Sequence, residues 1–102
     1  MACSKGEPPQ TQLTAAESAV RAAEVGGGET IPKGQLHLKH ARDQIQQANA
    51  LIAEKKYEEA ELVLKRAEID AHYALALAQH AEARAEAQEV MKRIDELMEE
   101  GK

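Results

Sequence analysis

The sequence has little aromatic material: its 102 residues include two tyrosines but neither tryptophan nor phenylalanine. Ligand pockets are walled mainly by aromatic and large aliphatic side chains, so this scarcity argues against a deep small-molecule site. No apolar run approaches the roughly 18 residues that a membrane-spanning helix needs. The formal charge of −5 argues against nucleic-acid binding, which requires a basic surface.

What the chain does contain is alanine and charge. Hydrophobic residues make up 43%, many of them alanine, and charged residues make up 30%. This composition is typical of long helices and coiled coils, and the length allows one small domain. Nucleophile motifs are absent, and the Gly26–Gly28 run lacks the lysine and strand of a phosphate loop. We therefore expect an all-α, non-enzymatic protein that needs no cofactor.

Helix signals divide the chain into a flexible tether, residues 1–12, and a helical domain, residues 13–100. Thr14 and Glu17 predict a capping box at the start of a helix over 14–25, which Gly26–Gly28 would end. Further helices are predicted over 34–54 and 57–100. The first helix would either fold back to complete a three-helix bundle or lie end to end with the second.

The second and third predicted helices carry matching apolar seams. Their spacing of three and four residues is that of an antiparallel pair folded at Lys55-Lys56. In that register leucine and isoleucine mostly face alanine, as close packing requires, and Arg42 falls near Glu68. The seams consist of Leu38, Ala41, Ile45, Ala48 and Ile52 on one helix and Tyr57, Ala60, Leu64, Ala67, Ala71, Ala74, Ala78, Ala81 and Ala85 on the other.

Apolar residues left outside the seam predict an interaction surface on the third helix. An isolated helix of this length is marginal in water, so the first helix or a second copy of the chain must cover them. We therefore expect self-association into a homo-oligomer. The predicted surface comprises Leu62, Ile69, Tyr73, Leu77, Val90, Ile94 and Leu97.

Histidines raise a metal-binding hypothesis. His37 and His40 are three residues apart, and His40 shares a level with His72 in the predicted register. Both would project outward from the seam, away from each other, and no inward Glu-x-x-His motif joins them. We therefore predict surface histidines and no metal site, with a metal-binding helical bundle as an alternative function.

The N-terminal segment resembles the start of a mature bacterial lipoprotein. Cys3, the single cysteine, follows Ala2 and precedes a polar tract containing Pro8 and Pro9. The resemblance implies that Cys3 carries acyl chains after removal of a signal peptide, and Ser4 implies outer-membrane sorting. The expected location is the periplasmic face of the outer membrane, or the cytoplasm if Cys3 is not a lipobox cysteine.

The helical part resembles small proteobacterial lipoproteins of uncharacterised function, whose alanine-rich domain sometimes precedes an OmpA-like domain. The resemblance covers about Leu36 to Ala87 and includes the turn from Leu51 to Ala60 and the run Ile69-Asp70-Ala71-His72-Tyr73-Ala74. It implies a lipid-anchored, non-enzymatic envelope protein. This chain departs from the family in having no OmpA-like domain, which puts direct non-covalent peptidoglycan binding in doubt.

Two weaker resemblances supply alternatives. Tyr57, Ala60, Leu64 and Ala67 are spaced as in the second helix of a tetratricopeptide repeat, but Ala71 replaces the expected proline and no repeat follows. This implies a hairpin-based protein–protein interaction module. The chain also resembles murein lipoprotein, which is small, helical and joined to peptidoglycan through a C-terminal lysine; the corresponding residue is Lys102.

Overall fold

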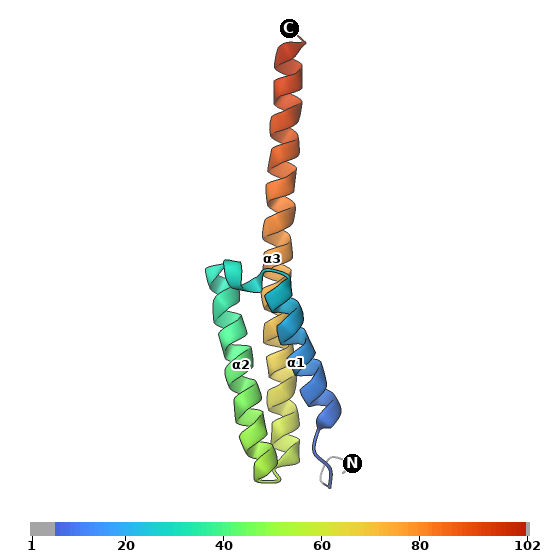
Figure 1. Ribbon diagram of the computed structural model, residues 1–102, viewed down its shortest axis with the longest axis vertical. Coiled ribbons are helices and arrows are strands. Elements are labelled where there is room, and N and C mark those ends of the chain that lie inside the picture. Colours follow the sequence, from blue (N-terminus) through green and yellow to red (C-terminus); the bar gives the residue numbers. More distant parts are fainter. Residues whose placement is uncertain (1–5, 102) are drawn as a thin grey trace.

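The computed structural model describes residues 6–101, and this range folds as an up-down-up arrangement of three α-helices. The elements are α1 (Gln10–Val25), the short 3-10 turn η2 (Gly28–Thr30), α2 (Pro32–Ala53) and α3 (Tyr57–Glu100). Figure 1 shows α2 and α1 flanking the first half of α3, whose second half rises alone above them. The predicted all-α fold with a long C-terminal helix is confirmed.

Helix α1 begins earlier than the sequence pattern predicts. Pro9 has a φ of −79° and is the residue before the helix, and its carbonyl accepts a hydrogen bond from the Leu13 amide at 3.0 Å. Proline suits a helix entry because its φ is fixed and its missing N–H would be unpaired there. Thr14 therefore lies inside the helix, and the predicted capping box at Thr14 is wrong.

The connection between α1 and α2 is compact because its glycines permit close backbone approach. Gly27 has a φ of 89°, in the left-handed region. Gly34, in the first turn of α2, lies against the backbone of Gly28: a Cβ there would stand 2.1 Å from the Gly28 carbonyl oxygen. Only glycine fits this contact, which holds η2 against α2.

Arg42 fastens the same junction from outside. Its Nη2 donates to Glu24 Oε2 at 2.6 Å and also to Glu29 Oε2, so one guanidinium joins α2 to α1 and η2. These hydrogen bonds raise the pKa of Arg42 above its ordinary value. The expectation that Arg42 lies near Glu68 overlooked these two carboxylates, which α1 brings to Arg42 by folding back.

The turn between α2 and α3 falls at the predicted residues, Lys55-Lys56. The Lys56 amide donates to the Leu51 carbonyl at 2.8 Å and the Lys55 amide to the Ile52 carbonyl at 2.9 Å, the paired bonds of a Schellman motif. Lys55 occupies the left-handed position of that motif with a φ of 62°. This closed turn starts α3 antiparallel to α2.

The core is built mainly from alanine, as the seam pattern predicts. Leu38 and Leu64 are its largest fully buried side chains. Small residues let the helices approach closely without aromatic groups. The remaining buried hydrophobic residues are Ala16, Ala19, Val20, Ala23, Ala41, Ala48, Ala60, Ala67, Ala71, Ala74 and Ala78, while Ile45 and Ile52 are half-buried beside them.

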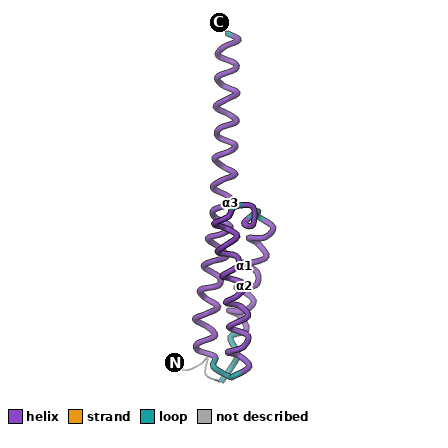
Figure 2. Tube along the Cα trace, turned by 90° about the vertical axis from the view of Figure 1, so that its left-hand side faces the viewer, coloured by secondary structure: helices purple, strands orange, loops and turns teal. Residues whose placement is uncertain are grey.

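Helix α1 folds back against the base of α3 and does not extend α2 end to end. Gln12 Nε2 donates to Glu61 Oε2 at 2.8 Å, which ties the start of α1 to the start of α3. Because α1 lies beside the first half of α3, it does not cover the second half, and every residue from Gln79 to Gly101 is exposed. The views in Figures 1 and 2 show this segment as a free helical rod, and the molecule measures 74 × 24 × 16 Å.

Among the described residues, no helix has both the length and the apolar character needed to cross a membrane.

Candidate functional site

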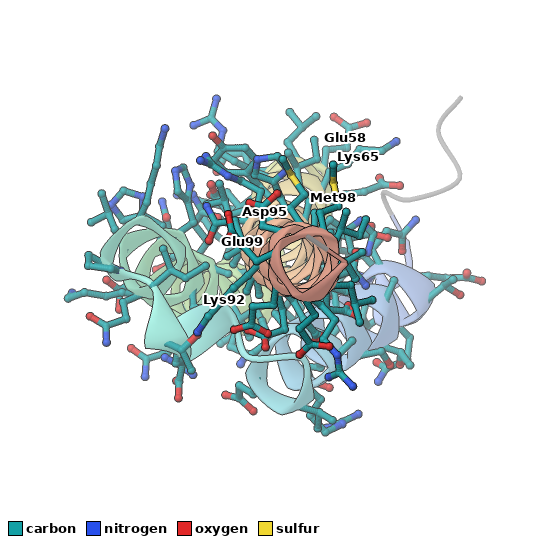
Figure 3. The ribbon with its side chains drawn as sticks, turned by 90° about the horizontal axis from the view of Figure 1, so that it is seen from above. Glu58, Lys65, Lys92, Asp95, Met98 and Glu99 are labelled. Carbon is teal, nitrogen blue, oxygen red and sulfur yellow. The ribbon has the colours of Figure 1, made fainter. Side chains whose placement is uncertain are left out.

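The predicted interaction surface forms an open face on α3. Figure 3 looks down the helix and shows Met98 projecting on the same side as Lys65 and Glu58. Neither α1 nor α2 covers this side, so α1 does not bury the apolar residues that the sequence left outside the seam. The exposed fractions are 70% for Leu62, 64% for Ile69, 40% for Tyr73, 57% for Val90, 49% for Ile94 and 57% for Leu97.

These exposed residues belong to one continuous stripe, which we call the outer stripe. Its spacing alternates four and three residues through Leu62, Arg66, Ile69, Tyr73, Ala76, His80, Ala83, Ala87, Val90, Ile94 and Leu97. The buried residues of α3 lie two positions earlier, which is the opposite side of a helix. Sequence reasoning found the two ends of the outer stripe but missed Ala83 and Ala87, which connect them.

A period of 3.5 residues distinguishes the outer stripe from an ordinary amphipathic face. A straight helix has 3.6 residues per turn, so such a stripe stays on one side only if the helix supercoils around a partner. Met91 and Met98 widen the stripe over the rod and are 65% and 66% exposed. The outer stripe over the rod therefore has the residue spacing of a coiled-coil strand.

Leu77 differs from the other predicted surface residues because it is half-buried. Together with Ile31 and His80 it lines a shallow groove where the rod leaves the three-helix region. Leu77 thus marks the shoulder of the molecule, to one side of the outer stripe.

A second candidate site joins α2 to α3 below the shoulder. His37 Nδ1 lies 2.8 Å from Asp70 Oδ1, and the two side chains are 24% and 17% exposed. His40 stands one turn further along α2, with its ring centroid 5.9 Å from that of His37. One potential ligand atom from each of the three residues lies within 4.8 Å of the others. Tyr73 packs edge-on to His37, with ring centroids 4.7 Å apart.

This His37–His40–Asp70 cluster was not foreseen from the sequence, which compared His40 with His72. His72 and His80 are exposed and belong to no comparable group within residues 6–101. The signal that could have found Asp70 is its flanking position, one residue before the buried Ala71, on the side of α3 that faces α2. Cys3 and Lys102 lie outside the described residues.

Comparison with known proteins gives a family without an assigned activity. The family described as a domain of unknown function, DUF4398, matches residues 11–90. This range contains the three-helix region except Gln10, the first residue of α1, together with the His37–His40–Asp70 cluster and the first half of the rod. No curated protein and no solved structure matches the chain.

Proposed function

The chain belongs to the DUF4398 family, and we propose that within it this protein is a lipid-anchored, periplasmic envelope scaffold that assembles through its rod. The role is structural and non-enzymatic. The observation that carries it is the exposed rod, residues 79–101, whose outer stripe has a coiled-coil period. A lone helix of that length is only marginally stable in water, so a partner would stabilise it.

We assign that partner as a second copy, packed antiparallel. In an antiparallel coiled coil, each of the two alternating core positions of the heptad faces the other kind of core position on the partner helix. In the arrangement proposed here, the sequence numbers of two facing residues sum to 177. Ile94 then faces Ala83 of the second copy, and Val90 faces Ala87. Large side chains meet small ones at these two levels, as at most levels of the α2–α3 seam, while Leu97 faces His80 at the next level.

Charge supports the same register. Positions flanking the outer stripe face each other across an antiparallel pair, which brings Arg93 opposite Glu86 of the second copy. The twofold symmetry makes this contact twice. A parallel pair would instead stack identical residues and place Arg66 against Arg66 and His80 against His80. Size and charge complementarity therefore both favour the antiparallel arrangement.

The length of the rod also fits this register. With positions summing to 177, the tip residue Gly101 lies level with Ala76 of the second copy, close to its shoulder. The overlap spans residues 76–101, which is about 39 Å at 1.5 Å per residue. Each rod is therefore covered by the other over its whole free length, and only residues 76–78 of each three-helix region fall within the overlap.

Reversing one flanking charge tests the register. Glu86→Arg or Arg93→Glu puts like charges opposite each other twice, and we expect either variant to weaken self-association by about tenfold. Combining the two reversals restores both pairs with exchanged signs and should recover the affinity. Sedimentation velocity over a concentration series measures all four proteins.

Lys92→Glu is the matched control, because it changes the net charge as Arg93→Glu does but lies on another side of the helix from Met98 (Figure 3). It should leave self-association near the wild-type value. A parallel pair would place methionines beside Glu86 and Arg93, so failure of the double reversal to recover affinity contradicts the antiparallel register. A wild-type protein that stays monomeric at every concentration contradicts self-association itself.

The membrane anchor rests on the sequence around Cys3, and it has its own test. We expect the gene, expressed with its natural upstream sequence in a Gram-negative host, to yield protein that incorporates a fatty-acid label and sediments with outer membranes. Cys3→Ser should abolish both, since lipoprotein anchoring depends on the acyl chains. Label-free, soluble wild-type protein would instead place the chain in the cytoplasm or the soluble periplasm.

A second candidate role is a protein–protein interaction module. Leu62, Ile69 and Tyr73 remain exposed after the rods pair, because they lie on the three-helix region outside the overlap. A partner that binds the Ile94→Glu variant described below through this face would establish the module, since that variant leaves the face unchanged.

A further inference from the structure

The His37–His40–Asp70 cluster has the donor set of a transition-metal site. His37 and His40 are three residues apart on α2 and therefore lie on the same face of that helix. Asp70 projects from α3 to meet them, so the donors come from two helices that the buried alanine core fixes together. Imidazole nitrogen with one carboxylate oxygen is a ligand combination that suits Zn²⁺.

We propose that these three residues bind one divalent transition-metal ion of the Zn²⁺ class. Bonds of about 2.0–2.2 Å in a tetrahedral site place neighbouring donors about 3.4 Å apart. His37 Nδ1 and Asp70 Oδ1 are already at 2.8 Å, and the three donors lie within 4.8 Å of one another. Rotation of side chains closes the difference, because His40 is exposed and has room to turn. Three protein donors leave the fourth position to water.

The hydrogen bond between His37 and Asp70 is compatible with this coordination, because the proton of a neutral His37 imidazole can sit on either ring nitrogen. Nδ1 of His37 donates to the Asp70 carboxylate when it carries the imidazole proton. Neutral imidazole holds one proton, and its transfer to Nε2 frees the Nδ1 lone pair for the metal while Asp70 stays ionised. Metal binding then replaces the hydrogen bond between α2 and α3 with two coordinate bonds to the same ion.

His40 separates metal binding from a simple interhelical hydrogen bond. The pair His37–Asp70 alone would tie the helices, and His40 takes no part in that bond. A purely structural pair therefore gives His40 no zinc-dependent role, whatever its ring contact with His37 contributes to stability. A metal site makes His40 necessary for the response to metal.

The test is zinc titration by calorimetry, together with thermal melts, in a Cys3→Ser background that removes the thiol as a competing ligand. We expect one zinc ion per chain and a higher Tm with zinc than without. His40→Ala should weaken zinc binding by at least about tenfold, since even outer-shell changes at metal sites reach that size. The rise in Tm on adding zinc should shrink in His40→Ala, a comparison within each variant that is independent of what the His37–His40 ring contact contributes without zinc.

His72→Ala is the matched control, an exposed histidine on α3 outside the cluster, and it should bind zinc as the parent does. Mg²⁺, which prefers all-oxygen ligands, should produce neither heat nor a Tm change. Equal zinc affinity in His40→Ala and the parent, or stoichiometry that drops with His72→Ala, overturns the proposed site. Absence of zinc-dependent heat in the parent does so as well.

Discussion

Gly34→Ala will lower the free energy of unfolding by about 2 kcal/mol or more, because backbone must move to admit one methyl group. The added Cβ would stand 2.1 Å from the Gly28 carbonyl oxygen, whose own chain is held in η2. Alanine is the better helix former by about 1 kcal/mol, and the clash must exceed that gain. Shifts of this size lower the Tm of a domain of this length by roughly 10 °C.

Gly101→Ala is the control for Gly34→Ala. Its Cβ would meet the Met98 carbonyl oxygen at 3.6 Å, an ordinary contact, and its φ of −73° suits any residue. Melting both variants at one protein concentration by circular dichroism keeps self-association from biasing the comparison. A Gly34→Ala protein as stable as the wild type would mean that η2 and α2 do not need this contact.

Ile94→Glu will abolish most self-association. Each antiparallel pair buries two copies of Ile94, and each copy contributes at least about 1.5 kcal/mol when removed from water. Losing both costs about 3 kcal/mol, which raises Kd by more than about 100-fold. Two new carboxylates facing an alanine seam add a desolvation cost to that loss.

Helix content should fall together with the assembly. The rod, residues 79–101, has no cover in the monomer, so its helix becomes marginal and the circular dichroism signal per residue decreases. Ala85→Glu adds the same side chain on the opposite side of α3 and should behave as the wild type. Unchanged sedimentation of Ile94→Glu would exclude the outer stripe as the contact between copies.

The α2–α3 hairpin was predictable because its signal is periodic. Alanine recurs at heptad spacing on α3 and is matched by leucine and isoleucine on α2, so only one fold of the chain aligns the two seams. Every α3 seam residue from Ala60 to Ala78 is buried as that pattern requires, whereas Ala81 and Ala85, which lie beyond the end of α2, are exposed. A periodic pattern indicates which side of a helix is buried, and many turns of the helix support the same assignment.

Side-chain partners on the flanks of the seam were less predictable. Counting levels along the two predicted helices paired Arg42 with Glu68 and His40 with His72. In the structure, Arg42 instead bonds Glu24 and Glu29, and His37 bonds Asp70. Flank contacts depend on helix rotation and on where the third helix docks. The only sequence signal in the loop between α1 and α2 is its glycines. Glycine permits many backbone conformations, so it does not indicate which way α1 folds.

The opposite positions of the N-terminal end and the rod tip determine where the two N-terminal ends of an antiparallel pair would lie. Gly6 precedes α1 at the base, and the rod tip lies at the other end of the 74 Å axis. If the proposed pair forms and Cys3 carries the proposed lipid anchor, two such molecules overlapping over about 39 Å span roughly 110 Å, with a lipid tether at each extremity. Tethers entering one membrane would lay the assembly flat along it as a strut, whereas tethers entering two facing membranes would set the distance between them.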